Sequence, residues 1–204
     1  MTASGSKFKE DPTEKVKVPF GLLNLEFWPV TATPAAAHPT YGEPVSLGAA
    51  VKFYITVQLA EGSISGDDVL QLSASEFSGA DVQTETLLSD LEVQSKLFGA
   101  KYSADGGLVS GANDVVVTGA LRGVQKLKTK TGVIYRAVLL YQTTPIVSDF
   151  QADTKGESVS FLTNPINFKA YADNTGAWRH MKDFDTLEAA ETWLGSVRAG
   201  TATT

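Results

Sequence analysis

The chain has 204 residues, 43% of them hydrophobic, and a formal net charge of −6, which fits one domain with an ordinary core. Its 20% charged content argues against both wholesale disorder and a strongly basic nucleic-acid binder. Cysteine is absent, which excludes disulfides, thiolate metal sites and a cysteine nucleophile.

The two ends of the chain lack the apolar content of a folded domain. Residues 1–15 are small or charged, with Phe8 as their bulky apolar side chain, and they predict a flexible N-terminal arm. Residues 199–204 predict a flexible C-terminal tail in the same way. We therefore expect the folded domain to span residues 16–198.

A strand and a long loop open this domain. Phe20–Val30 is predicted to be a β-strand. The next segment, 31–49, contains Pro34, Pro39 and Pro44 and is long for a loop in a compact domain. We expect a long inter-strand loop there that is either functional or partly disordered.

Alternating apolar and polar residues predict the strands that follow. Val51–Leu59 alternates with a period of two, which is typical of a half-buried strand. Val115–Leu127 and Val133–Gln142 flank a set of turn residues and predict a long hairpin. The second strand of this hairpin is apolar on both faces, so we expect it to be central and covered on both sides. Further strands are predicted at Val69–Phe77, Ser158–Thr163, Ile166–Tyr171 and Ala177–Met181.

Two short amphipathic helices interrupt the β pattern. The first is predicted to start at Ser89, which forms a capping box with Glu92, and to stop at Gly99. The second is predicted to start near Asp185 and to stop before Gly200. Their apolar residues recur at helical spacing, so both helices are expected to cover a sheet.

Acidic and basic residues occupy different parts of the chain. Residues 53–95 contain eight acidic side chains and no lysine or arginine, whereas residues 115–148 contain five basic side chains and no acid. Opposed charges on one chain suit a protein that binds copies of itself. The acidic candidates for this role are Glu61, Asp67, Asp68, Glu76, Asp81 and Glu85, and the basic candidates are Arg122, Lys126, Lys128 and Lys130.

The four basic candidates share a parity, so along a strand they point to one face. This face lacks interleaved aromatic residues and the chain is acidic overall, which favours a protein–protein interface over nucleic-acid contact. A solvated hairpin edge, protected by lysine against aggregation, is an equally good interpretation.

The sequence contains no pattern that indicates an enzyme. His38 and His180 lack nearby partner ligands, so packing or exposure is favoured over a metal or general-base role. The Asp67–Asp68 pair lacks the further oxygen ligands of a calcium loop. A serine-nucleophile elbow, a phosphate-binding loop and a dinucleotide-binding fingerprint are all absent. We therefore expect no catalytic, metal or cofactor site.

The apolar residues are not arranged for a membrane. Apolar runs stay well short of about twenty residues, and the N-terminus lacks the charged-then-apolar pattern of a signal peptide. We expect a soluble protein that is synthesised in the cytoplasm and does not insert into membranes.

A series of segments carries a further indication through its order and spacing. These segments are Val18–Phe27, Thr40–Pro44, Gly66–Asp68, Asp90–Gly99, Val133–Tyr141, Thr154–Ser158, the strand with Trp178 and the helix around Trp193. Together they resemble the major tail tube proteins of long-tailed, siphovirus-type bacteriophages. The likeness covers roughly residues 16–198.

The resemblance implies a mainly β fold, a β-sandwich or barrel-like tail tube fold with a flanking α-helix and a short C-terminal helix. It implies that six copies form a ring and that rings stack into a hollow tube, whose inner strands close into one barrel. The tube would conduct genome DNA into the host during ejection. The implied location is the virion tail. The implied partners are other copies, the tape measure, tail tip and terminator proteins, and double-stranded DNA in transit, with no active site or cofactor.

This resemblance gives the separated charges a specific meaning. A basic bore would hold DNA tightly through counterion release, so a conduit calls for an acidic or neutral lining. We expect some of the six acidic candidates to face the bore or a contact between rings, and the face from Arg122 to Lys130 to meet acidic surface on a neighbour. The 31–49 loop and the two terminal arms are candidates for sealing one ring to the next.

Two alternative functions remain open at this point. A tube protein of a contractile tail, or of a related bacterial secretion machine, shares the implied fold. A monomeric β-sandwich binding module belongs to another class and would need aromatic residues clustered on one sheet face. Trp28, Trp178 and Trp193 are dispersed along the sequence instead, which disfavours the binding module.

Overall fold

The structure is a computed structural model that describes residues 16–66, 69–87, 90–147 and 163–200. Several predicted features lie outside these ranges. They are the arm 1–15, Asp67, Asp68, Ser89, the strand Ser158–Thr163 except for its last residue, and residues 201–204.

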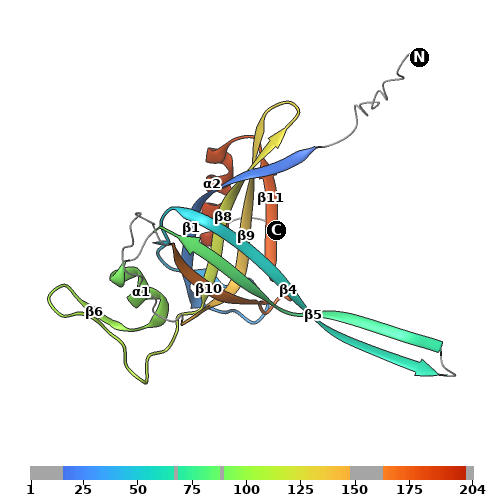
Figure 1. The fold of residues 1–204 in the computed structure, drawn as a ribbon, viewed down its shortest axis with the longest axis horizontal. Coiled ribbons are helices and arrows are strands. Elements are labelled where there is room, and N and C mark those ends of the chain that lie inside the picture. The colour runs from blue at the N-terminus through green and yellow to red at the C-terminus, as the bar shows by residue number, and fades with distance from the viewer. Residues whose placement is uncertain (1–15, 67–68, 88–89, 148–162, 201–204) are drawn as a thin grey trace, which may run out of the picture.

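The described residues are mainly β-strands, with two α-helices (Figure 1). The strands are β1 (Lys17–Ala32), β2 (Thr40–Tyr41), β3 (Val45–Ser46), β4 (Ala50–Gly66), β5 (Val69–Thr86), β6 (Lys101–Ser103), β7 (Gly107–Val109), β8 (Gly119–Thr129), β9 (Val133–Ile146), β10 (Asn164–Tyr171) and β11 (Arg179–Phe184). The helices are α1 (Leu91–Phe98) and α2 (Leu187–Arg198).

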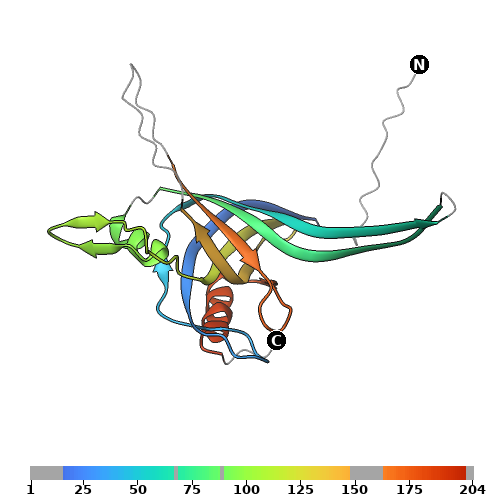
Figure 2. The ribbon, with the colours of Figure 1, turned by 90° about the horizontal axis from the view of Figure 1, so that it is seen from below.

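One large antiparallel sheet dominates the fold. Its strand order is β2-β1-β8-β9-β10-β5-β4, while β3 pairs with β1 and β11 pairs with β9. The small hairpin β6–β7 lies beside α1 at one end of the molecule (Figures 1 and 2). Among the described residues β4 and β1 do not pair with each other, so the sheet is not closed.

The first hydrophobic core lies on the concave face of this sheet. Phe27 of β1 and Leu121 of β8 meet Phe168 of β10 and Val82 of β5, and all four side chains are buried. The rings of Phe27 and Phe168 stack with their centroids 5.9 Å apart. Because strands far apart in the sheet share one core, the sheet must curl around it.

The second core lies between the opposite face of the sheet and α2. Ala190 and Leu194 of α2 are fully buried against a cluster that includes Leu139 of β9. The next residue along β9, Leu140, belongs to the first core and is also fully buried. Successive strand residues point to opposite faces, so β9 is covered on both sides, and the predicted central position of this strand is confirmed.

The predicted long hairpin is confirmed as β8 and β9, although its first strand starts later than predicted. Its turn is held by Thr129, whose backbone N–H donates to the carbonyl of Gly132 at 2.8 Å. β8 starts at Gly119 rather than at Val115, because the preceding residues run past α1 instead of pairing with β9. In that connection the N–H of Val117 donates to the carbonyl of Leu97 at 2.9 Å.

Both helix starts were predicted one residue too early. Asp90 has the extended backbone of an N-cap, and its carboxylate accepts from the N–H of Glu92 at 2.7 Å. The predicted cap, Ser89, lies outside the described residues. Thr186, not Asp185, caps α2 and accepts from the N–H of Ala189 at 3.2 Å. Each predicted cap stands next to another good capping residue, and the one whose oxygen reaches a free N–H decides the boundary. The stop of α1 at Gly99, with φ of 70°, is confirmed.

The segment 31–49 is shorter as a loop than predicted, because it contains β2 and β3. Both short strands pair with β1, and the side chains of Val45 and Leu47 are buried in the first core. The backbone N–H of Leu47 also donates to the carbonyl of Leu25 at 3.0 Å. The second half of this segment is therefore part of the folded body.

The predicted strand Ala177–Met181 is shifted toward the C-terminus. A turn closed by the hydrogen bond from the N–H of Asp173 to the carbonyl of Ala177, at 2.8 Å, precedes it. Pairing with β9 begins at Arg179 and continues to Phe184.

Candidate interaction surface

The hairpin β4–β5 extends far beyond the body of the protein (Figures 1 and 2). β10 pairs with β5 only between residues 80 and 86. Further out, β5 has β4 as its one strand partner among the described residues, and the other edge of β4 is unpaired along its length. We call residues 57–62 and 74–79 the outer hairpin. Its strands present unpaired backbone groups, which can pair with another chain.

One face of the outer hairpin is an apolar strip that continues the first core outwards. Phe53 and Ile55 of β4 pack against that core. With the strand period of two, Val57 and Leu59 follow on the same face, yet they are 42% and 52% exposed. The body ends where they begin, so the strip has no covering partner in the described part of the chain.

The base of the outer hairpin is fixed to the body by an aromatic stack. The ring of Phe77 stacks on Trp178, with centroids 4.6 Å apart and planes within 12°. The guanidinium of Arg179 also lies over Trp178, 4.4 Å from the ring centroid. A register shift in the β4–β5 pairing occurs at the same place, between Gln58 and Leu59. These contacts hold the hairpin in its projecting direction.

The acidic candidates divide into two groups. Glu61 and Glu76 are exposed on the outer hairpin, and the register places them on opposite faces, because Ala60 pairs with Glu76 whereas Glu61 pairs with Ser75. Asp67 and Asp68 lie outside the described residues. The remaining two, Asp81 and Glu85, lie on the body.

Asp81 and Glu85 belong to an open polar face of the sheet. Asp81 accepts a hydrogen bond from Gln58, and Glu85 forms an ion pair with Lys52 at 3.2 Å. Lys169 of β10 is the strand partner of Asp81 and is exposed beside it. This face carries both signs of charge and is turned away from the first core. Its outer residues also include Tyr54, Thr56, Gln83 and Tyr171, all exposed.

Three of the four basic candidates, Lys126, Lys128 and Lys130, lie at a second projection, the tip of β8 and β9 with the start of β1 (Figure 1). We call residues 17–21 and 126–133 the basic finger. Lys126 is half-buried, with its stem against Gly21, whereas Lys128 and Lys130 are exposed. None of these three lysines has an ion-pair partner among the described residues.

Arg122 does not belong with these lysines, which corrects the prediction that it meets a neighbouring subunit. Its side chain is 7% exposed and forms ion pairs with Glu26 at 2.6 Å and with Glu191 of α2 at 2.5 Å. The guanidinium also lies over the ring of Trp28. The shared face holds for Arg122, Lys126 and Lys128, whereas Lys130 lies beyond the end of β8. At Arg122 this face is covered by α2, and it becomes free only towards Lys128.

Asp183 neutralises two other basic residues of the finger region. It accepts two hydrogen bonds from Arg136, at 2.7 and 3.0 Å, and one from Lys17. The hydrogen bonds from Arg136 are the main reason that the pKa of Asp183 falls to about 2. These contacts tie β11 to the finger.

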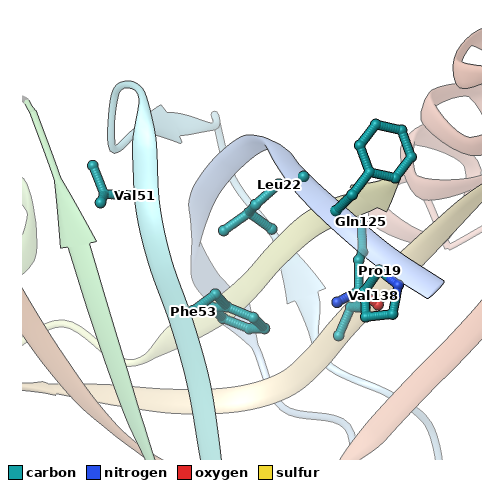
Figure 3. A pocket seen from close by; sticks show the side chains of 8 residues that line it. Pro19, Leu22, Val51, Phe53, Gln125 and Val138 are labelled. Carbon is teal, nitrogen blue, oxygen red and sulfur yellow. The ribbon is translucent and has the colours of Figure 1, made fainter. Parts of the chain in front are cut away.

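A cleft of about 300 Å³ lies between β1 and β4, where the sheet fails to close (Figure 3). Pro19 and Leu22 come from β1, Val51 and Phe53 come from β4, and Val138 comes from β9. Phe20, at a register shift in β1, also lines the cleft and is 56% exposed. The cleft therefore adjoins the basic finger.

A polar and aromatic cluster was missed in the sequence. Asp173, with no exposed side-chain surface, contacts Nδ1 of His38 at 2.6 Å. The ring of His38 stacks on Tyr141 at 4.2 Å, and the hydroxyl of Tyr141 lies 3.0 Å from Nδ1 of His180. Both histidines thus meet around one tyrosine. His38 and Asp173 are 135 residues apart, so local spacing carried no signal for the pairing.

The surroundings of this cluster shift three pKa values. Burial acts to raise the pKa of Asp173, but hydrogen bonds from His38 and Thr175 outweigh it and hold the pKa below its usual value. Burial lowers the pKa of His180, and the charges of Lys182 and His38 act in the same direction. Burial also raises the pKa of Tyr141. The cluster pins the segment around His38 to the body.

The described residues contain neither a cluster that could bind a metal ion nor a helix that could span a membrane. The described residues contain no group of three or more histidine, aspartate or glutamate side chains that could hold a metal ion. Within the same residues, every helix is too short and polar to cross a bilayer. No protein-family model and no curated protein sequence matches the chain.

Proposed function

We propose that this chain is a virion structural protein whose hexameric rings stack into the tail tube of a long-tailed, non-contractile bacteriophage. The observation that carries the proposal is the outer hairpin: a long pair of strands with unpaired edges and an exposed apolar strip, which projects from the body above the stack of Phe77 on Trp178. A lone domain has no use for such an edge, which is an aggregation hazard unless another copy covers it.

The open sheet and its flanking layers suit the same role. In this proposal the curled sheet is a β-sandwich or barrel-like tube fold, in which neighbouring subunits complete the unclosed edge between β4 and β1. Joining the edges of successive copies by one repeated head-to-tail contact generates a ring when the rotation closes. The tube conducts double-stranded DNA and carries out no enzymatic reaction.

The open polar face of β4, β5 and β10 is the surface that we assign to the bore. Asp81 and Glu85 are balanced there by Lys52 and Lys169, so the face has little net charge to hold phosphates. Lys128 and Lys130 lie on the basic finger instead. A tube map with Lys126 and Lys128 lining the lumen would contradict this assignment.

Light scattering coupled to size-exclusion chromatography tests the proposal. The purified chain should form species whose mass is a multiple of six subunits, with longer assemblies as the protein concentration rises. Raising the ionic strength should shift the distribution if opposite charges contribute to the contacts. A species that stays at the mass of one chain, about 21.7 kDa, across the concentration range would reject it.

A further inference from the structure

We propose that the outer hairpin of one copy docks on the basic finger of the next, with the apolar strip seated at the cleft between β1 and β4. The inference rests on the proposed assembly and names the two surfaces that make its repeated contact. In one copy these surfaces project from different ends of the molecule, so neither covers the other (Figure 1).

The two surfaces have opposite charges. The outer hairpin carries Glu61 and Glu76, both exposed, and the sequence has no lysine or arginine between residues 53 and 95. The basic finger carries Lys126, Lys128 and Lys130, and these have no ion-pair partner in the described part of the chain. Opposed charges speed the encounter of two such surfaces and fix their orientation.

Both surfaces also expose apolar side chains that a contact would cover. Val57 and Leu59 of the outer hairpin are 42% and 52% exposed, and Val18 and Phe20 of the basic finger are 53% and 56% exposed. The cleft beside Phe20, at about 300 Å³, has room for a leucine side chain. An interface with an apolar centre and charged residues around it is the common arrangement in protein assemblies.

The unpaired edges add backbone complementarity. The outer edge of β4 is unpaired, and the edge of β1 before Leu25 that faces away from β8 is unpaired among the described strands. A strand of one copy can therefore add to an edge of the next, as in other cases of β-augmentation. Because hairpin and finger are different surfaces, the contact is head-to-tail and suits a ring.

Single cysteines provide a direct test, because the natural chain has none. Phe20→Cys and Leu59→Cys are made as separate proteins of different tagged length, mixed under assembly conditions and treated with a short bismaleimide. We expect at least about tenfold more crosslinked heterodimer from this pair than from the control pair Ala112→Cys and Leu59→Cys. Both residues of the control pair are also exposed, so accessibility to the reagent is matched. Equal yields from the two pairs in assembled material would overturn the docking while leaving the tube proposal intact.

A charge exchange tests the same contact without crosslinking. Lys126→Glu with Lys128→Glu, or Glu61→Lys with Glu76→Lys, should each raise the concentration needed for assembly about tenfold. A chain carrying all four changes should return to within about threefold of the natural chain, because every contact then pairs opposite charges again. If the chain with all four substitutions assembles as poorly as the two double variants, the docking is overturned. A natural chain that never assembles would instead reject the proposed function, and the docking with it.

Discussion

Asp173 joins two segments that lie far apart in the sequence. Its carboxylate contacts the ring of His38 and accepts from the backbone N–H and hydroxyl of Thr175, at 2.8 and 2.7 Å. The ring of His38 then stacks on Tyr141, whose hydroxyl reaches His180. A buried carboxylate is tolerated only with such partners, so this cluster fixes the connection between β1 and β2 onto the body.

Acidification should therefore weaken the fold through His180. Its folded-state pKa is lowered, so below the unfolded value of about 6.5 the unfolded chain binds more protons than the folded one. The stability is fully present above that pH and falls as the pH drops towards the folded pKa. Asp173 acts in the same direction at lower pH, because its lowered pKa gives stability that is lost as the pH falls through it.

His180→Gln should reduce the loss of unfolding free energy between pH 7.5 and pH 5, because glutamine does not titrate. Urea unfolding at the two pH values measures the difference. Met181→Gln, on the exposed neighbouring position of β11, is the control and should keep the natural pH dependence. An unchanged pH dependence in the His180 variant would show that another group is responsible.

Arg122 and Lys128 lie on the same strand face but should behave differently when replaced by alanine. Arg122→Ala leaves Glu26 and Glu191 without their buried partner and should lower the unfolding free energy by about 3 kcal/mol. Lys128→Ala should change it by less than about 0.5 kcal/mol, because that side chain is exposed. Chemical denaturation of both variants gives the comparison. Similar losses in the two would contradict the assignment of Arg122 to the fold.

At the scale of elements, sequence periodicity correctly predicted the strands that pack on the two cores. The alternation of Val51–Leu59 and the apolar run of β9 follow from burial on one face or on two, and both were found as strands. Periodicity failed where no core imposes it. β4 continues to Gly66 through Glu61 and mostly small residues that show no alternation, and among the described strands this part of β4 pairs with β5 alone.

For the candidate interaction surface, only the separation of acidic and basic residues could be predicted from the sequence. The separation of acidic from basic residues was visible in the sequence, and the structure places Glu61 on the outer hairpin and Lys128 on the basic finger. The sequence could not show that α2 covers Arg122, because strand parity identifies a face without identifying what packs on it. The sequence also could not show that His38 and His180 meet at Tyr141, because these residues are far apart in the chain.

The stack at the base of the outer hairpin should control how rigidly it projects. Trp178→Ala removes the partner of Phe77 and should raise amide hydrogen exchange in residues 57–62 and 74–79 by about fivefold, for a loss of about 1 kcal/mol. Tyr54→Ala is the control, because that side chain is 56% exposed on the other face of β4. If both variants leave exchange in the hairpin unchanged, the stack does not fix it.

At the scale of the whole molecule, the fold divides into a packed body and projections that lack partners. The two cores and α2 belong to the body, whereas the outer hairpin and the basic finger expose apolar and charged groups. Stability and assembly should therefore be separable by mutation, because they depend on different residues.

Shortening the outer hairpin should abolish assembly and spare the fold. Residues 61–75 are replaced by Asn-Gly, which joins the paired residues Ala60 and Glu76 through a two-residue turn. The shortened chain should keep its β-rich circular dichroism and cooperative unfolding, because Phe77 and the cores are retained. It should remain monomeric in light scattering. Assembly at the natural concentration would show that residues 61–75 are dispensable for it.

Negative-stain electron microscopy of the purified natural chain at high concentration tests the central claim most directly. The account predicts rings, or tubes of stacked rings, with sixfold symmetry and a uniform bore. Particles that remain the size of one chain at every concentration would contradict it.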